Sequence, residues 1–252
     1  MISLYNGDCR DILVDLINDG IKVDMVLTDP PYGTTHLSWD SVIPFDDIWP
    51  LIYDISNDNT PILLFGIEPF SSYLRLSNVK DYKYDFYWKK ERITNISQVK
   101  RRAGKIIETI SVFYRKQPYY NPQMVKYNGP KRTNKVKNGC LGDITNKGGC
   151  NKVKEYVDTG YRYPTQLLEF KRDILKCNLH PTQKPVDLLK YLIKTFTKEN
   201  DIVLDFTMGS GSTGVACIET NRSFIGIEKD PKIYKIAEDR IKDSEIINDF
   251  FD

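Results

Sequence analysis

Short apolar runs alternate with amphipathic helical patterns at both ends of the chain, and this order constrains the fold more than any other feature. The predicted strands occupy residues 2–8, 23–29, 60–66, 82–90, 106–116, 201–206 and 223–228. The predicted helices occupy residues 9–18, 45–56, a short stretch after 68–70, 184–197, a segment from 212, and 230–241. Strands that alternate with helices predict an α/β fold with a doubly wound, mostly parallel sheet.

Residues 117–175 interrupt this alternation. They are rich in Asn, Gly, Lys and Tyr and show no clear hydrophobic period. A stretch of this length without a helix or strand signal is usually functional or mobile. We therefore predict one α/β domain built from both ends of the chain, with an irregular basic insertion between them.

The charge of the chain is strongly segregated. The formal net charge is only +2, but residues 83–154 hold 18 Lys and Arg against 4 Asp and Glu. So uneven a block favours a polyanionic partner, nucleic acid, over an ordinary solvated surface. It indicates phosphate contacts without indicating which sequence is read. The side chains expected to contact DNA are Trp39, Lys89, Arg92, Arg101, Arg102, Lys131 and Arg132.

Other features bear on location and metals. No apolar run approaches the length of a membrane span, and the first residues lack the zones of a signal peptide. The five cysteines are odd in number and scattered, which predicts a reduced, cytoplasmic protein. Cys140, Cys150, Cys177 and His180 are the conceivable zinc ligands, but no C-x₂-C pair exists among them, so no metal is expected.

The stretch LTDPPYG at residues 27–33 ends the second predicted strand. Its two prolines remove backbone donors and fix φ, so they cannot continue a β-ladder. They form instead a rigid platform that carries the carboxylate of Asp29, the carbonyl of Pro30 and the ring of Tyr32. The alternative interpretation is a proline-terminated strand with a capping Asp, which accounts for neither the second proline nor the tyrosine.

The stretch DFTMGSGSTGVA at residues 205–216 follows a predicted strand and opens a helix. Its glycines allow a tight turn and close approach of the backbone to a ligand, and amides at a helix start attract an anionic group. It is not a P-loop, because no Lys follows the second glycine as that motif requires. Asp205, at the end of the strand, suits an ammonium group. The alternative is a tight connection without a ligand.

Glu228 closes the next predicted strand, at the spacing from Asp205 where an acid binds ribose hydroxyls in nucleotide-binding units. The alternative is an acid that favours the dipole of the following helix. An ammonium site, an anion-binding turn and a ribose-binding acid together describe a nucleoside joined to an amino acid. S-adenosylmethionine is such a molecule.

With DPPY at 29–32, HPTQKP at 180–185 and the glycine turn at 205–216, the chain resembles the β-class amino DNA methyltransferases, in a compact form similar to phage-encoded members. This family methylates N6 of adenine or N4 of cytosine. The resemblance implies a Rossmann-like S-adenosylmethionine-dependent methyltransferase fold with a circularly permuted motif order. It also implies a catalytic part at 1–116, a target recognition region at 117–175 and a cofactor-binding part at 176–252.

The resemblance assigns residues to roles. Asp29, Pro30, Pro31 and Tyr32 are the implied catalytic residues. The implied cofactor-binding residues are Asp8, Cys9, His180, Thr182, Gln183, Lys184, Asp205, Phe206, Thr207, Gly209, Ser210, Gly211, Ser212, Thr213, Glu228 and Lys229. The glycine turn lacks the proline that the family commonly has after the acid, which we expect to change its stiffness more than its chemistry.

The expected function is methylation of the N6 amine of an adenine flipped out of duplex DNA. Asp29 and the Pro30 carbonyl are expected to accept the two N–H groups of the amine, while Tyr32 stacks on the base. Cytosine N4 is the alternative target; family members with that target more often have Ser in place of Asp29. RNA or protein amides are less favoured, and a non-catalytic DNA-binding or anti-restriction module is the alternative from another class. A homodimer and a restriction endonuclease partner are further possibilities that the family implies.

Overall fold

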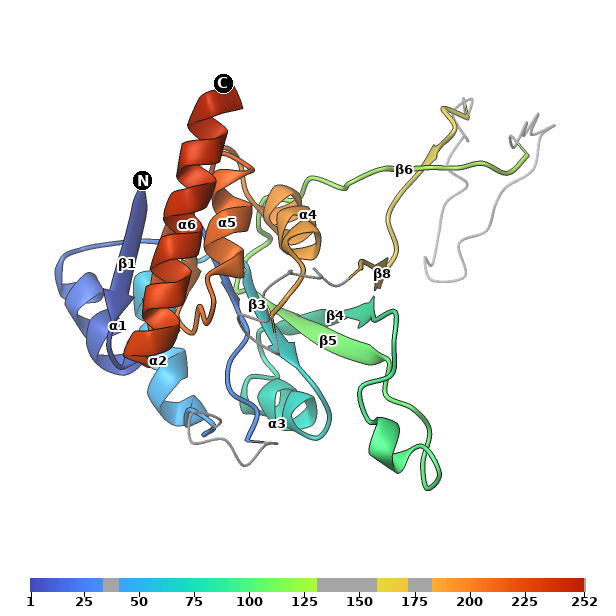
Figure 1. Ribbon diagram of the computed structural model, residues 1–252, viewed down its shortest axis with the longest axis horizontal. Coiled ribbons are helices and arrows are strands. Elements are labelled where there is room, and N and C mark those ends of the chain that lie inside the picture. Colours follow the sequence, from blue (N-terminus) through green and yellow to red (C-terminus); the bar gives the residue numbers. More distant parts are fainter. Residues whose placement is uncertain (34–40, 131–157, 172–182, 252) are drawn as a thin grey trace, which may run out of the picture. The chain divides into compact units, whose positions relative to one another are not determined.

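The computed structural model of the chain describes residues 1–33, 41–130, 158–171 and 183–251 (Figure 1). The chain divides into two compact units. The larger comprises Met1–Asn121 and Thr165–Asp252, and the smaller comprises Pro122–Pro164. The larger unit therefore contains both ends of the chain.

The larger unit is built on one eight-stranded sheet with the order β1-β10-β9-β2-β3-β5-β4-β8. The neighbours from β1 to β3 are parallel, β5 runs antiparallel to both β3 and β4, and β8 runs parallel to β4. The strands are β1 (Ile2–Asn6), β2 (Met25–Thr28), β3 (Ile62–Gly66), β4 (Tyr82–Lys89), β5 (Ile107–Phe113), β8 (Leu167–Glu169), β9 (Ile202–Asp205) and β10 (Ser223–Glu228).

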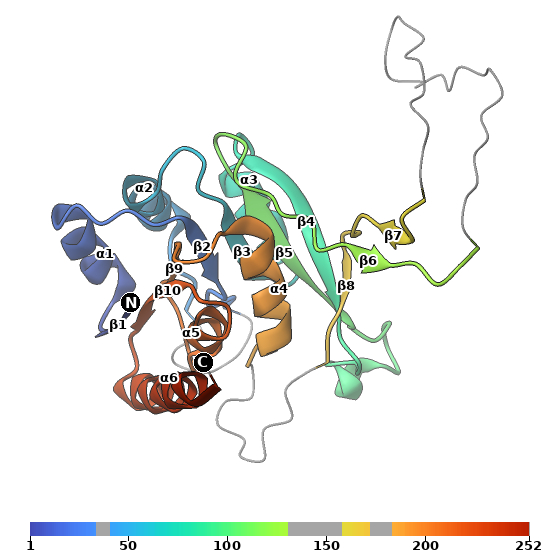
Figure 2. The ribbon, with the colours of Figure 1, turned by 90° about the horizontal axis from the view of Figure 1, so that it is seen from above.

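Helices cover both faces of this sheet (Figures 1 and 2). Along β2, Met25 and Leu27 pack with α4, α5 and α6, whereas Val26 packs with α1, α2 and α3, because successive side chains of a strand point to opposite faces. The helices are α1 (Cys9–Asn18), α2 (Phe45–Ile55), α3 (Phe70–Ser77), α4 (Val186–Phe196), α5 (Ser212–Ile218) and α6 (Pro231–Phe251).

The centre of the sheet is a topological switch point. β2 and β9 are parallel neighbours, with Val26 opposite Leu204. From β9 the chain passes through α5 to β10, and from β2 it passes through α2 to β3, on the other side. Ligands of open α/β sheets bind beyond the carboxyl ends of strands at such a point. This geometry brings together the ends of β2 and β9, which are far apart in the sequence.

The predicted doubly wound, mostly parallel α/β fold is confirmed, as are the predicted strands and helices of the two chain ends. The prediction of no strand in 117–175 is wrong for β6 (Val125–Lys126), β7 (Tyr161–Arg162) and β8, of which β8 pairs with β4. The amide of Tyr87 donates to the carbonyl of Gln166 at 2.8 Å, and the indole of Trp88 donates to the carbonyl of Phe170 at 3.0 Å. Three residues are too few to show a period, so only this tertiary pairing defines the strand.

The smaller unit contains a two-stranded antiparallel ribbon of β6 (Val125–Lys126) and β7 (Tyr161–Arg162). The guanidinium of Arg162 lies 4.4 Å from the ring centroid of Tyr127 and forms an ion pair with Asp158 at 2.7 Å. The assignment of 117–175 to target recognition stays a prediction. Across the parts of the chain that the structure describes, no helix combines the length and apolar character of a membrane span.

Candidate active site

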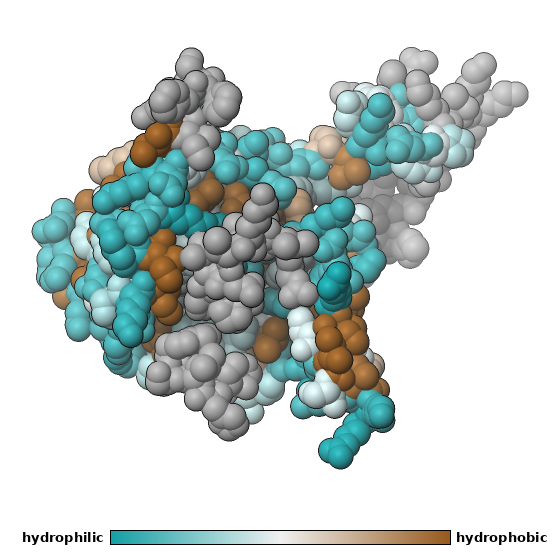
Figure 3. Space-filling model, in the orientation of Figure 1, coloured by the Kyte–Doolittle hydropathy of each residue, from teal (hydrophilic) through white to brown (hydrophobic). Residues whose placement is uncertain are grey.

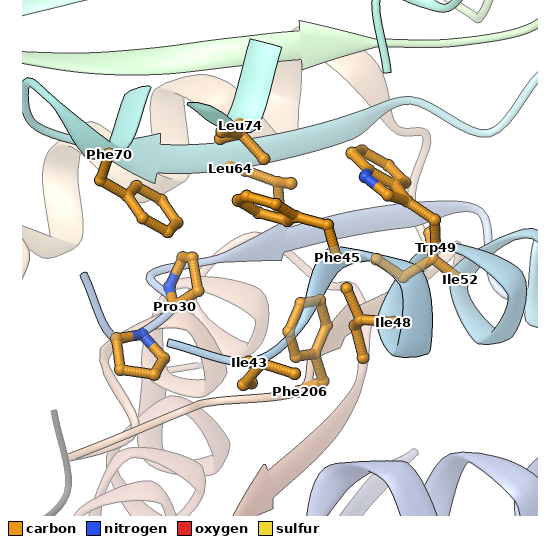
Figure 4. Close-up of a pocket in the computed structure, with 11 residues that line it drawn as sticks. Pro30, Ile43, Phe45, Ile48, Trp49, Ile52, Leu64, Phe70, Leu74 and Phe206 are labelled. Carbon is orange, nitrogen blue, oxygen red and sulfur yellow. The ribbon is translucent and has the colours of Figure 1, made fainter. Parts of the chain in front are cut away.

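The DPPY platform begins where β2 ends. Asp29 follows the last residue of β2, and Pro30 and Pro31 lie over an apolar pocket of about 20 Å³ (Figure 4). The other residues that line this pocket are Ile43, Phe45, Ile48, Trp49, Ile52, Leu64, Phe70, Leu74 and Phe206. Packing against these residues fixes the two proline rings in position. The backbone that carries Asp29 and the Pro30 carbonyl is therefore rigidly held.

The carboxylate of Asp29 is held by two side chains. The hydroxyl of Tyr32 donates to its Oδ1, and the ammonium of Lys184 contacts its Oδ2. Both partners also reach Glu108 of β5, whose Oε1 lies 3.0 Å from the Tyr32 hydroxyl and 2.8 Å from Lys184 Nζ. Lys90 forms an ion pair with the other oxygen of Glu108. This cluster of two acids, two lysines and a tyrosine connects three elements of the fold to the platform.

Burial and charge oppose one another in this cluster. Burial raises the pKa of the Asp29 carboxyl above its usual range, and Lys184 offsets part of that rise. Burial also raises the pKa of Glu108, but the ammonium groups of Lys184 and Lys90 outweigh it and lower this pKa to about 2. The pKa of Lys184 is raised, because its two carboxylate partners outweigh its burial. Glu108 and Lys184 are therefore charged at neutral pH.

Neither Glu108 nor Lys90 was predicted as a site residue, and Lys184 was expected to contact the cofactor only. The sequence does hold one signal for Glu108, the only charged residue within the run IIETISVF that contains β5. Acids are rarely fully buried unless they are paired. That rule indicates a partner for Glu108 but cannot name it.

Asp205 lies at the end of β9, next to the platform. Its Oδ1 accepts hydrogen bonds from the Thr28 hydroxyl at 2.6 Å and the Thr207 amide at 3.2 Å, and its Oδ2 accepts one from the Thr213 hydroxyl at 2.6 Å. Burial raises the pKa of Asp205 to about 6, and the hydroxyl donors limit this rise. The hydroxyl of Thr207 also donates to the carbonyl of Asp29 at 3.2 Å. The two motifs are thus joined directly by hydrogen bonds.

The glycine turn links β9 to α5. Gly209 and Gly211 adopt φ angles of 53° and 78°, which L side chains rarely adopt. A Cβ on Gly211 would meet Ala237 and Ile241 of α6 at 3.0–3.2 Å, whereas a Cβ on Gly209 would meet nothing within 4 Å. Gly211 therefore permits close helix packing, and Gly209 leaves open space.

Glu228 and Arg240 brace this turn. The Glu228 carboxylate accepts from the Gly209 amide at 3.1 Å and from the Asp230 amide at 2.8 Å. Arg240 of α6, which was not predicted, donates to the Ser210 carbonyl at 3.1 Å and the Ser212 hydroxyl at 2.9 Å. The Gln183 carboxamide, with its oxygen turned towards Arg240, accepts at 2.8 Å. Gln183 thus reaches the glycine turn through Arg240.

Asp8 and Cys9 form the start of α1. Asp8 is the N-cap of this helix: its carboxylate accepts from the Arg10 amide at 3.0 Å and pairs with Lys229 at 3.1 Å. The Arg10 side chain, followed by smaller contributions from Lys229, holds the pKa of Asp8 well below its usual range. Cys9 is buried, and its burial raises the pKa of the thiol to about 12. This corner presents fixed charges and no reactive thiolate.

Most of the predicted site residues line one cleft of about 1310 Å³. Asp29 and Tyr32 line it together with Asp205, Gly209 and Glu228. The remaining predicted site residues that line it are Asp8, Cys9, Pro30, Pro31, Gln183, Lys184, Phe206, Thr207, Ser210, Ser212, Thr213 and Lys229. The cleft is at least as large as common small-molecule sites. It therefore has room for a nucleoside cofactor and a base side by side.

The cleft matches the chemistry of the expected cofactor. Two carboxylates, of Asp205 and Glu228, lie beside open space at Gly209. An ammonium group and ribose hydroxyls are the ligand groups that such carboxylates bind. Within the described ranges, no three His, Cys, Asp or Glu side chains are arranged to hold a metal ion.

The predicted DNA-contacting residues fall in different places. Lys89 forms an ion pair with Glu169 of β8 at 2.7 Å. Arg92, Arg101 and Arg102 are exposed on the connection between β4 and β5, where Figure 3 shows apolar side chains (brown, lower right) next to hydrophilic ones. Trp39, Lys131, Arg132, His180 and Thr182 lie outside the described residues, as do Cys140, Cys150 and Cys177.

Comparisons with known proteins agree with this geometry. A type II methyltransferase of Lactococcus lactis, M2.LlaDCHI, is 48% identical over 62 residues, which are 25% of this chain and 23% of that enzyme. M1.MboII of Moraxella bovis, also a type II methyltransferase, is 24% identical over 251 residues, with 90% and 91% of the two chains covered. The match to M2.LlaDCHI thus spans about a quarter of that enzyme.

The solved structure of an M1.HpyAVI–SAM complex superposes with a TM-score of 0.66 at 27% identity, and the match covers 96% of this chain and 99% of that one. A family model described as DNA methylase, for N6 and N4 methyltransferases, matches residues 23–239. The match includes the DPPY platform, the glycine turn and both central strands of the sheet. The chain belongs to the N6/N4 DNA methylase family.

Proposed function

We propose that the protein is a site-specific DNA methyltransferase that transfers a methyl group from S-adenosylmethionine to the N6 amine of an adenine flipped out of duplex DNA. One observation carries the proposal: Asp29 at the end of β2 and Asp205 at the end of β9 line the same cleft, joined through Thr28 and Thr207. A target amine bound at Asp29 and a cofactor bound at Asp205 would therefore be neighbours.

The cofactor supplies an electrophilic methyl group on a sulfonium. Asp205 binds its ammonium group, and Glu228 binds its ribose hydroxyls. The open space at Gly209 receives part of the methionine moiety. Asp8 and Lys229 face the adenosine end. The family resemblance assigns these roles, and the positions of the residues around one cleft support them.

Asp29 and the Pro30 carbonyl act on the target amine. The lone pair of an exocyclic amine is conjugated with the ring, so the amine is a poor nucleophile. When its two N–H groups donate to these two oxygens, the nitrogen becomes more tetrahedral and its lone pair points to the methyl group. The oxygens also stabilise the positive charge that develops on the nitrogen. As the N–C bond forms, the bond between the methyl carbon and the sulfonium sulfur would break and leave S-adenosylhomocysteine, and the methylated cationic amine would lose one proton to solvent. The Tyr32 hydroxyl, which now occupies Asp29 Oδ1, gives way to the amine.

The target amine is inaccessible inside a duplex, so the base leaves the stack at a cost of a few kcal/mol. The ring of Tyr32 recovers about 1–3 kcal/mol by stacking on the base. The basic residues of the β4–β5 connection hold the DNA backbone meanwhile. A duplex with 2-aminopurine at the target position reports this step, and we expect its fluorescence to rise on binding of wild-type protein but not of Tyr32→Ala.

The decisive experiment measures methyl transfer from labelled S-adenosylmethionine to duplex DNA. We expect wild-type protein to methylate DNA and Asp29→Ala to lose this activity while it retains cofactor binding. Transfer that persists in Asp29→Ala would refute the role of Asp29. Nucleoside analysis of the product identifies the base, and N4-methylcytosine alone would replace adenine with cytosine as the target. A homodimer and an endonuclease partner stay predictions.

A further inference from the structure

Asp29 belongs to a cluster of ion pairs that also contains Glu108, Lys90 and Lys184. Lys184 lies two residues before α4, and its ammonium group forms ion pairs with Asp29 and Glu108. Only 9% of its side chain and 3% of that of Glu108 are exposed, against 27% for Asp29. All three side chains line the cleft, and that of Asp29 is the most exposed of them.

Stability alone does not account for this cluster. Removing charges from water costs about as much as their attraction returns, so buried ion pairs contribute little net stability. Here two acids and two lysines balance in charge, and the cluster includes the carboxylate that is expected to touch substrate. Such an arrangement is better suited to hold a reacting group in position.

We propose that Lys184 and Glu108 are positioning residues for methyl transfer, an inference that rests on the proposed function. Lys184 holds Oδ2 of Asp29, so that Oδ1 accepts from the target amine once the Tyr32 hydroxyl has turned away from it. Glu108 forms an ion pair with Lys184, which fixes the position of the ammonium group and balances its charge. The ammonium of Lys184 then does not oppose the positive charge that develops on the amine nitrogen.

The two residues act on Asp29 in opposite directions. The charge of Lys184 lowers the pKa of the Asp29 carboxyl, and the charge of Glu108 raises it. The other groups around Asp29 are Tyr32 on the platform, Asp205 on β9 and, beyond Glu108, Lys90, which directly follows β4. Single variants of Lys184 and Glu108 each remove one of the two opposing charges.

The test compares wild-type protein with Lys184→Met, Glu108→Gln and the double variant. Methyl transfer to duplex DNA is measured in single-turnover experiments over a range of pH, and S-adenosylmethionine affinity is measured by calorimetry. We expect Lys184→Met to lower the transfer rate roughly 100-fold, the cost of a misplaced reacting group. Glu108→Gln lowers it on the order of 10-fold, the size usual for residues that act through another. Cofactor affinity stays within about threefold of wild type in both, well under the tenfold that 1.4 kcal/mol represents.

The pH profiles separate positioning from a merely structural role. The acid limb of the rate profile, which reports ionisation of Asp29, moves to higher pH in Lys184→Met and to lower pH in Glu108→Gln. The transfer rate of the double variant resembles that of Lys184→Met, since Glu108 positions Asp29 through Lys184, whereas its acid limb lies between those of the two single variants. Lys184→Arg keeps the charge and recovers part of the rate, which guards against a folding defect in Lys184→Met.

The chain offers a matched control. Lys190 on α4 also bridges two acids, Asp187 at 2.7 Å and Glu219 at 2.8 Å, but at the surface. Lys190→Met and Glu219→Gln should leave rate and pH profile unchanged.

Three results would overturn the inference: a near-wild-type rate in Lys184→Met, a loss explained wholly by weaker cofactor binding, or acid limbs that move the same way in both variants. Failure of the proposed function is distinguishable, because it appears as no transfer by wild-type protein or as an active Asp29→Ala.

Discussion

The hydroxyl of Thr28 donates to the carboxylate of Asp205 at 2.6 Å, across 177 positions of sequence. Thr28 is the last residue of β2 and directly precedes Asp29, and Asp205 is the last residue of β9. This bond therefore ties the strand that precedes the DPPY platform to the strand that ends at the proposed cofactor site. Both residues are almost completely buried.

Thr28→Val tests this tie. The variant keeps the shape of the side chain but removes a donor, so a buried carboxylate loses one partner at a cost of about 1–3 kcal/mol of unfolding free energy. The pKa of Asp205 should rise further, and affinity for S-adenosylmethionine at neutral pH should fall. Calorimetry and thermal unfolding measure the two effects. Thr195→Val on α4, where the buried hydroxyl donates to the Tyr191 carbonyl at 2.7 Å, should lower stability but not affinity.

Cofactor binding should depend on pH through Asp205. Only its ionised form attracts an ammonium group, and its pKa is raised to about 6. Affinity for S-adenosylmethionine should therefore be highest near pH 7 and fall by roughly tenfold per pH unit well below 6. Asp205→Asn should bind weakly at every pH between 5 and 8. A wild-type affinity that is flat over this range would contradict the assignment of Asp205 to the ammonium.

The same group affects stability with the opposite trend. The pKa of Asp205 is higher in the folded protein, about 6, than its ordinary value of 3.8, so its contribution is greatest below 3.8 and is lost as pH rises through 6. The rise of the Asp205 pKa from 3.8 to about 6 corresponds to roughly 3 kcal/mol of unfolding free energy. Asp205→Asn should consequently unfold at a higher temperature than wild type at pH 7.5, with the difference shrinking towards pH 4. Denaturation at several pH values checks this.

Two glycine substitutions should have separable effects. Both glycines have positive φ, so each Ala costs about 1–2 kcal/mol of strain. Gly211→Ala adds a clash with α6, for roughly a further 1–3 kcal/mol, and should mainly lower the unfolding temperature. Gly209→Ala meets no protein atom and should mainly weaken cofactor binding. Equal loss of cofactor affinity in both variants at matched stability would argue against a ligand at Gly209.

The β4–β5 connection is predicted to hold DNA phosphates. The double variant Arg101→Gln, Arg102→Gln should weaken binding to all duplexes similarly, and the slope of log affinity against log salt should fall by about 2. Arg115 and Lys116, at the opposite end of β5, pair with Asp58 and provide the control. Their double Gln variant should leave the salt slope unchanged. Fluorescence anisotropy at several salt concentrations measures both.

The sequence by itself determined the order and type of the elements. Apolar runs such as that of β2 and amphipathic stretches such as that of α4 carry their periods locally, and the prolines at 30 and 31 end a ladder in any context. The glycines at 209 and 211 likewise predict a turn, because the positive φ that they adopt is a local property. Family resemblance then supplied roles for the DPPY platform and the glycine turn.

Only the tertiary structure decided what surrounds the Asp29 carboxylate, the proposed catalytic acid. Glu108 lies in β5 and Lys90 directly follows β4, and the local sequence of neither segment names a partner. Lys184 is distant from Asp29 in the sequence. Likewise β8 exists only because β4 offers an edge to pair with. Side-chain periodicity is a property of one segment, whereas an ion pair or a strand pair belongs to two. Contacts between distant segments arise only when the sheet brings them together, and in this protein they hold the acid of the active site.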